Sequence, residues 1–361
     1  MRVAGRITIT APTAWLPAAA VTAADALAEG RIKEEDAQAT GYRSLPVATD
    51  LAPPQLAARA ARRAYRRAGR TPDDTDVVLH AWIHHQGHDF WSPAHYVAHE
   101  AGALDAVPIG IQQMCNGGAA ALETAAARLL SAQPPRTVLV TTADRFDDAA
   151  FDRWRGDYGL WYGDAGTAAL LHGTPTAPDP RADAPALLLH SVVTVAAPAL
   201  ETMHRGDDPF SEVPRPYGTR IDVRRTKRAF LRRHGKEALA EVVRDKVAEV
   251  LRTALDEAGT SPGGPRPAVV VMPRLGQAAL TDVYGPVVRG VTDAPLLDLG
   301  ADTGHLGAGD VLANLADLTE GPHRLAPGEY AVLLGAGGGF TWSCLVVQRP
   351  PQRHVPERNP R

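Results

Sequence analysis

The residue whose position most clearly suggests chemistry is Cys115, which stands between an apolar segment and a run rich in glycine and alanine. Residues 107–130 read VPIGIQQMCNGGAAALETAAARLL, so a strand is expected to end at Met114 and a helix to open after Asn116. Unpaired N–H groups at a helix N-terminus favour a thiolate, and the adjacent glycines allow a tight turn. A thiolate there suits a nucleophile that forms a thioester. The alternative is a small buried core residue.

The second cysteine, Cys344, lies inside the apolar run TWSCLVV with no turn beside it, so we expect it to be packed in a strand and unreactive. Two cysteines do not make a disulfide framework. The first ten residues, MRVAGRITIT, lack the layout of a secretory signal. We therefore expect a reducing, cytoplasmic location.

Five histidines gather in the segment 81–100, AWIHHQGHDFWSPAHYVAHE. His95 and His99 are four residues apart on a predicted helix and share one face, so a metal site, and with it a metal-dependent hydrolase, is an alternative hypothesis. No HExxH motif is present, and neither cysteine lies at zinc-finger spacing. We expect no metal.

The elements that must position these residues alternate between short apolar runs and longer alanine-rich stretches, which predicts an α/β layered fold. Strands are expected at 77–79, 107–112, 137–141, 167–171, 186–195, 268–271, 330–334 and 341–347. Helices are expected at 52–68, 92–101, 117–130, 227–258, 277–288 and 309–318.

Two segments at corresponding places echo each other, YGDAGTAALL at 162–171 and GAGGGFTWSCLVV at 335–347. Each runs from a glycine-containing turn into a strand, and a proline-rich stretch at 173–185 lies between them. The pattern predicts two similar halves, 1–180 with the cysteine and 181–361 with the final glycine-rich turn.

Composition narrows the range of partners. The chain has 361 residues and a formal net charge of −3, with no basic excess that would indicate nucleic-acid binding and no apolar run long enough to span a membrane. The basic run from Arg224 to His234 is expected to be a solvated helix face, or a surface that meets CoA phosphates or an acidic carrier protein.

Four motifs stand in the order found in ketoacyl-ACP synthase III, a family of the thiolase-like superfamily: MCNGGAAALETAAARLL, WYGDAGTAALL, GHLGAGD and GAGGGFTWSCLVV. The chain resembles that family over nearly its whole length. The resemblance implies a thiolase-like five-layered αβαβα fold made of two similar halves, and a homodimer. It also implies a tunnel through which acyl-CoA or acyl carrier protein reaches Cys115, with this thioester as donor substrate and no separate cofactor.

The chain departs from that family at two positions. A condensing synthase of this type stabilises the enolate formed by decarboxylation with a histidine in a Pro-His-Gln-Ala-Asn motif and an asparagine in a Gly-Asn-Thr-Ser motif. Here Arg274 in MPRLGQ replaces the histidine, and His305 in GHLGAGD replaces the asparagine. A guanidinium is not a base at neutral pH. We therefore do not expect decarboxylative carbon–carbon bond formation.

The remaining set suits acyl transfer to an oxygen or nitrogen nucleophile. Cys115 is expected to carry the acyl group, His305 to remove a proton from the acceptor, and Asp310 to orient the imidazole as a triad member does, or else only to cap a helix. The resemblance implies an oxyanion hole from the N–H groups of Cys115 and Gly338. The pattern is similar to synthase-III-like acyltransferases of natural-product pathways, of the cervimycin malonyltransferase type.

The substrates are less well defined by the residues. The acceptor suggested by this subgroup is a hydroxyl on a sugar of a glycosylated polyketide. The family places a pocket loop near His88 and Trp91, and the guanidinium of Arg274 would either hold an acyl carboxylate or form a structural ion pair. The alternatives are a condensing enzyme with altered auxiliary residues and a non-catalytic partner subunit in which Cys115 only packs.

Overall fold

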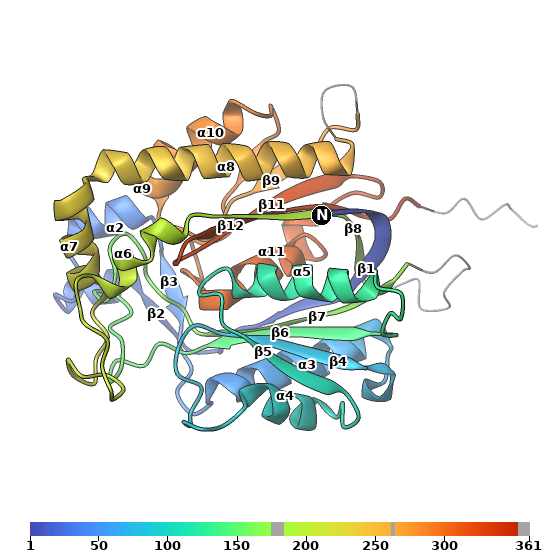
Figure 1. The fold of residues 1–361 in the computed structure, drawn as a ribbon, viewed down its shortest axis with the longest axis horizontal. Helices are drawn as coiled ribbons and strands as arrows, with labels where there is room; N and C mark the ends of the chain where they lie inside the picture. Colours follow the sequence, from blue (N-terminus) through green and yellow to red (C-terminus); the bar gives the residue numbers. More distant parts are fainter. Residues whose placement is uncertain (175–183, 261–263, 353–361) are drawn as a thin grey trace, which may run out of the picture.

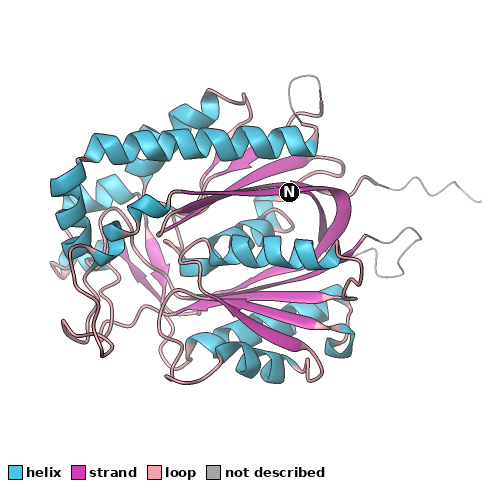
Figure 2. Ribbon diagram, viewed as in Figure 1, coloured by secondary structure: helices cyan, strands magenta, loops and turns pink. Residues whose placement is uncertain are grey.

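Ten strands form one hydrogen-bonded ladder that turns back on itself, so that two sheets lie face to face (Figures 1 and 2). The computed structural model describes residues 1–174, 184–260 and 264–352. The ladder runs in the order β10 (Leu296–Leu297), β9 (Val269–Val271), β11 (Tyr330–Gly337), β12 (Thr341–Gln348), β8 (Ala186–Ala196), β1 (Arg2–Trp15), β7 (Ala165–Gly173), β6 (Val138–Asp144), β4 (Val77–Ala81) and β5 (Val107–Ile111).

The turn between the two sheets lies in β1, which pairs antiparallel with β7 on one side and β8 on the other. Its register shifts between Thr10 and Thr13 against β7, and between Arg2 and Ile7 against β8. Such bulges bend a strand and increase its twist. One strand can therefore belong to both sheets.

Helices fill three layers around these two sheets (Figure 1). The central layer holds α5 (Gly117–Leu129) and α11 (Asp310–Asp317). One outer layer holds α3 (Pro53–Ala68) and α4 (Pro93–Ala101), and the other holds α8 (Lys236–Ala258) and α10 (Gly285–Arg289). Leu122 of α5 and Leu312 of α11 share one buried cluster with Val140 and Leu333, one from each sheet. The predicted five-layered αβαβα fold is confirmed.

The shorter elements lie around one end of the layers, where α7 and the β2–β3 pair are seen in Figure 1. They are β2 (Ala20–Thr22), α1 (Ala23–Ala28), α2 (Glu34–Thr40), β3 (Ser44–Pro46), α6 (Thr202–Arg205), α7 (Val223–His234) and α9 (Gln277–Ala279). None of the described helices combines the length and apolar composition needed to cross a membrane.

The sequence expectations differ from the structure in several places. The helix expected at 227–258 is two helices, α7 and α8, because Gly235 between them has φ +80° and ends α7. The helix expected at 277–288 is interrupted by a π-helical turn over Leu280–Tyr284. Most of the expected seam at 173–185 lies outside the described residues. The division at residue 180 stays a prediction.

Candidate active site

Cys115 lies on a sharp elbow between β5 and α5, as its sequence context predicted. Met114, directly before it, has φ +48°, a backbone conformation that side-chain-bearing residues rarely adopt. Asn116 is the N-cap of α5, so the thiol stands one residue before the N-cap. The side chain of Cys115 is partly exposed rather than sealed in the core. The packed-residue alternative therefore does not describe its surroundings.

The two glycines after Asn116 let another loop approach this elbow. A Cβ on Gly118 would lie 2.5 Å from the carbonyl oxygen of Ala308, and one on Gly117 would lie 3.2 Å from the Cβ of Ala308. Ala308 belongs to the GHLGAGD segment that leads into α11. Any larger side chain at these positions would push that segment, and His305 with it, away from the cysteine.

His305 is paired with Asp310 inside the protein. Nδ1 of His305 lies 2.7 Å from Oδ2 of Asp310, and Oδ1 of the same carboxylate accepts from the N–H of Leu306 at 2.8 Å. The two side chains are 1% and 6% exposed. The N-cap of α11 is Gly309, and Asp310 is its first helical residue. The carboxylate therefore fixes the ring rather than capping the helix.

The other ring nitrogen of His305 faces the cysteine's side of the site. Burial alone would lower the pKa of His305, but the charges of Asp310 and Cys115, and hydrogen bonding to both, raise it well above its usual value. Within the described part of the chain, Nε2 makes no hydrogen bond of normal geometry and is shielded from solvent. The raised pKa favours the protonated ring, and Nε2 is free for a reacting group.

The backbone of His305 is held by the WYGDAG segment. Its N–H donates to the carbonyl of Trp161 at 2.8 Å, its carbonyl accepts from Gly163, and the ring of Tyr162 meets the imidazole edge-on at 5.1 Å. The charge of Cys115 also contributes to raising the pKa of Tyr162, after burial and the charge of Asp157. Tyr162 therefore lies near both reactive groups.

Asp144, at the end of β6, is a buried residue that the sequence analysis missed. Its carboxylate accepts backbone N–H groups from Ile83 and His84 at 2.9 Å each and from Ala308 at 2.9 Å. A Cβ on Gly307 would collide with this carboxylate. Burial raises the pKa of Asp144 to about 7, against the lowering effect of these N–H groups. Asp144 thus ties the His305 loop to the loop after β4.

The turn carrying Gly338 lies against the same elbow. The side chain of Asn116 is fully buried and donates to Thr341 at 3.1 Å and Ser343 at 2.8 Å, both on β12. A Cβ on Gly337 would collide with the backbone nitrogen of Asn116. These contacts set the glycine-rich turn beside Cys115. The oxyanion-hole role of Cys115 and Gly338 stays a prediction.

Arg274 lies within the protein and is 2% exposed. Nε donates to Asn314, Nη1 to Thr303 and the carbonyl of Leu299, and Nη2 to Asp317 at 2.6 Å. One N–H of Nη2 is left over from this set of donors. These contacts include a structural ion pair, one of the two roles that the sequence allowed for Arg274. The other role, substrate binding, stays a prediction.

The other sequence-predicted residues are not brought to the cysteine by any described contact. His88 and Trp91 are exposed, with their rings 5.3 Å apart in an edge-on pair. His84 is buried against Phe146, and burial lowers its pKa to about 4. In the described ranges, no three His, Cys, Asp or Glu side chains are grouped to hold a metal ion.

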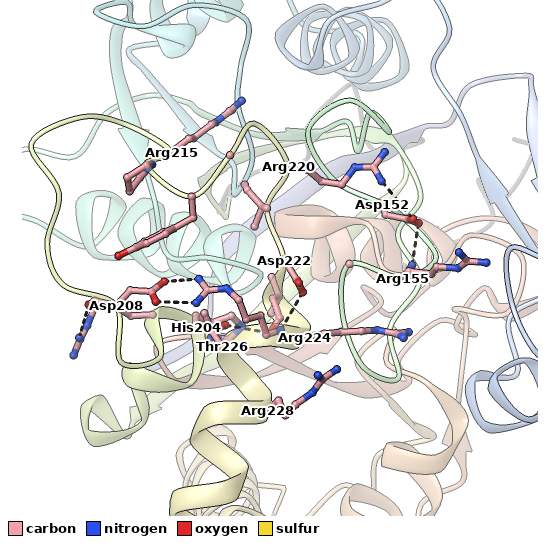
Figure 3. Close-up of a pocket in the computed structure, with 18 residues that line it drawn as sticks. Asp152, Arg155, His204, Asp208, Arg215, Arg220, Asp222, Arg224, Thr226 and Arg228 are labelled. Atoms are coloured by element: carbon pink, nitrogen blue, oxygen red, sulfur yellow. Dashed lines mark hydrogen bonds and ion pairs between the residues drawn. The ribbon is translucent and has the colours of Figure 1, made fainter.

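A cavity of about 690 Å³ opens between α7, the loop before it and residues 152–156 (Figure 3). Seven arginines and three aspartates line it, so it carries an excess of positive charge, and α7 contributes Arg224, Arg225 and Arg228.

Lys227 is an exception to the solvated helix face expected of this basic run. It is buried, and its Nζ lies 2.6 Å from Asp157. Asp157 in turn accepts from Tyr162 at 2.8 Å.

Cys344 has the environment that its sequence context predicted. It lies in the middle of β12, paired with Leu334 and Val193, and is fully buried. Burial raises the pKa of this thiol well above its usual value. A thiol held in its protonated form inside a sheet is a poor nucleophile.

Comparisons with known proteins identify similar sequences. Residues 109–183 match the family model described as 3-oxoacyl-[acyl-carrier-protein (ACP)] synthase III. A beta-ketoacyl-[acyl-carrier-protein] synthase III from Gloeobacter violaceus is 27% identical over 317 residues, which cover 86% of this chain and 88% of the relative.

Solved structures extend the likeness to the whole fold. ChlB3, described as an acyltransferase, is 31% identical and superposes with a TM-score of 0.84, covering 96% of this chain and 98% of its own. The priming beta-ketosynthase from the R1128 polyketide biosynthetic pathway is 21% identical with a TM-score of 0.71, covering 98% of this chain and 99% of its own, and shows a shared fold.

Proposed function

Because the chain belongs to the ketoacyl-ACP synthase III family of acyl-transferring enzymes with the thiolase fold, we propose that it moves an acyl group from a thioester, via Cys115, onto an oxygen or nitrogen nucleophile without decarboxylation. The observation that carries this proposal is the 2.7 Å pair of His305 and Asp310 beside the cysteine. A histidine oriented by a carboxylate is the arrangement that serves a covalent nucleophile as base and acid.

The first half of the reaction loads the cysteine. The thiolate of Cys115 attacks the thioester carbonyl, and the bond between that carbon and the donor sulfur breaks. The leaving thiolate takes the proton from the imidazolium of His305. We assign the N–H groups of Cys115 and Gly338 to receive the charge that develops on the carbonyl oxygen.

Loading itself prepares His305 for the second half. Once Cys115 is acylated its negative charge is gone, and with it one of the causes that raise the pKa of His305. The now neutral imidazole takes the proton of the acceptor hydroxyl as the oxygen attacks the acyl carbon. The carbon–sulfur bond to Cys115 breaks, and the imidazolium and thiolate are restored.

The surroundings of Arg274 support transfer over condensation. Decarboxylation in this family relies on a neutral histidine and an asparagine, and here the first is replaced by a guanidinium engaged with Asn314, Thr303 and Asp317. His305, which replaces the second, is committed to Asp310. We find no pair of groups left to stabilise an enolate among the residues described around Cys115.

Two surfaces support the proposed thioester donor and the proposed homodimer. The arginine-lined cavity suits the phosphate groups that acyl-CoA and acyl carrier protein both present. Strand β5 is at the edge of the sheet and exposes Val107, with Phe90 exposed nearby in sequence. An open edge with apolar side chains supports the proposed homodimer. We place the enzyme in the cytoplasm, acting on a hydroxyl of a glycosylated natural product.

Intact-protein mass spectrometry tests this function. Wild-type protein and the Cys115→Ala variant are incubated separately with acetyl-, malonyl-, butyryl- and benzoyl-CoA. We expect an acyl adduct on wild type with at least one donor, none on Cys115→Ala, and no release of carbon dioxide from malonyl-CoA. Carbon dioxide release with a carbon–carbon-linked product would show a condensing enzyme instead. An unmodified wild-type chain with every CoA and carrier-protein thioester would show a non-catalytic subunit.

A further inference from the structure

A partly buried histidine, His204 on α6, lies beside the turn that carries Gly338. A Cβ built on Gly338 would lie 2.5 Å from Cε1 of His204, with the other ring atoms close behind. The ring of Phe340, two residues later, is 5.4 Å from the imidazole. His204 therefore packs against Gly338, the residue whose N–H we propose as an oxyanion-hole donor.

His204 is also part of the lining of the arginine-rich cavity (Figure 3). The arginines Arg215, Arg220 and Arg225 are exposed, whereas His204 is mostly buried and its Nδ1 is shielded from solvent. The histidine thus forms the buried side of the cavity, between its charged opening and Gly338.

Among the described residues that line this cavity, only His204 has a side-chain atom that is shielded from solvent and has no hydrogen-bond partner. Nδ1 has no hydrogen-bond partner among the described residues. Burial and the nearby charge of Lys227 lower the pKa of His204 to about 4, against the raising effect of Asp157. The ring is neutral at physiological pH, so one nitrogen donates and the other accepts. A hydroxyl, which does both, fits either tautomer.

We propose that His204 is a specificity-determining residue that hydrogen-bonds a hydroxyl on the acyl group of the donor, so that hydroxylated acyl groups are loaded in preference to plain hydrocarbon ones. The inference rests on the proposed function, because it assumes a thioester whose carbonyl lies at Gly338. A buried polar atom left without a partner disfavours binding, and a site built around one discriminates against ligands that lack the matching group.

Two matched pairs of donors test this preference: 3-hydroxybutyryl-CoA against butyryl-CoA, and 2-hydroxybenzoyl-CoA against benzoyl-CoA. The rate of adduct formation on Cys115 is followed by intact-protein mass. In the wild type we expect the hydroxylated member of at least one pair to load about ten-fold faster. In His204→Leu we expect that ratio to fall to about one, with the hydrocarbon donor loading no slower than before.

Two further variants separate hydrogen bonding from shape. Asparagine carries an amide atom near the position of Nδ1, so His204→Asn is expected to keep most of the preference. His204→Met is a second apolar replacement in case the leucine variant does not fold. His323→Leu, which changes an exposed histidine in another part of the chain, should keep the wild-type ratio.

Some outcomes would contradict this inference alone, and one would also contradict the proposed function. A ratio of one for both pairs in the wild type, or a preference that survives in both apolar variants, would overturn the inference while leaving Cys115 loading intact. Equal slowing of both members of a pair would overturn it too, since His204 would then contact the part that all donors share. If no donor forms an adduct on wild type, the proposed function fails and the inference fails with it.

Discussion

His305 lies in the loop that meets the cysteine elbow, His204 lies against the turn that carries Gly338, and their surroundings give the two rings opposite properties. His305, on the loop before α11, has a carboxylate 2.7 Å away, and the pKa of its ring is raised well above the usual value. His204, on α6, has no partner at Nδ1 and a lysine nearby, and its pKa is lowered to about 4. Burial acts in the same direction on both rings.

Burial lowers the pKa of both rings, and only at His305 do neighbouring charges and hydrogen bonds outweigh it. A cationic imidazole next to a thiolate supports covalent chemistry and holds a proton for the leaving group. A neutral imidazole without a partner is suited to recognising a polar group. We therefore propose a role in the reaction for His305 and a role in selection for His204.

His305→Ala, which removes the imidazole paired with Asp310, is expected to have the largest effect on the reaction. We expect acyl transfer to fall by about 10³-fold, because the proposed base is removed, while loading of Cys115 continues at a reduced rate. The decay of a preformed acyl adduct in the presence of simple glycosides, followed by mass, measures transfer separately from loading. Normal decay of the adduct in this variant would contradict the proposed base.

Asp310→Asn makes the environment of His305 resemble that of His204. The largest raising effect on the pKa of His305 is removed, so burial prevails and the pKa falls. Because the base acts as neutral imidazole, the rising limb of the pH profile for transfer should move to lower pH. The maximal rate should fall by about 10²-fold, since the imidazolium is no longer stabilised. An unmoved limb would show that Asp310 does not tune His305.

Gly338→Ala perturbs the glycine-rich turn against which His204 packs. The added methyl group would lie 2.5 Å from the ring of His204, so the ring or the turn must move. We expect loading of Cys115 to slow by about ten-fold, less than complete loss of an oxyanion-hole donor would cause. Stopped reactions analysed by mass measure the rate. If loading is unchanged, Gly338 does not border the thioester.

Lys227→Met has the smallest expected effect on the reaction and acts mainly on stability. Removing the lysine leaves Asp157 as a buried charge without its ion pair, which should lower the free energy of unfolding by about 3–5 kcal/mol. Urea denaturation measures it. Arg232→Met, an exposed change on the same helix, is the matched control and should cost about 0.5 kcal/mol or less. Equal costs would mean that the Lys227 pair contributes nothing particular.

The sequence predicted those parts of the site that are adjacent along the chain. The elbow at Cys115 follows from a strand, a polar residue and two glycines in succession. The spacing of His305 and Asp310 is short enough for one loop and the helix after it to bring them together. The layered fold was also predictable, because alternating apolar runs and alanine-rich stretches persist along most of the chain.

The remaining groups depend on contacts between distant segments, which a local pattern does not reveal. Asp144 looks like the polar end of a strand until Ala308 is seen to donate to it. Lys227 looks like one more residue in a basic run, and only the fold shows Asp157 beneath it. The local sequence LETMHRG does not single out His204, because its proposed role depends on its contact with Gly338, which lies in the turn between β11 and β12.

The position of β1 at the junction of both sheets has a consequence for synthesis on the ribosome. This strand is made before both of its pairing neighbours, β7 and β8, which begin only at Ala165 and Ala186. β1 must therefore wait, with both edges open, until the segments of β7 and β8 have emerged. Its alternation of threonine with isoleucine from Ile7 to Thr10 leaves every second side chain polar during that wait.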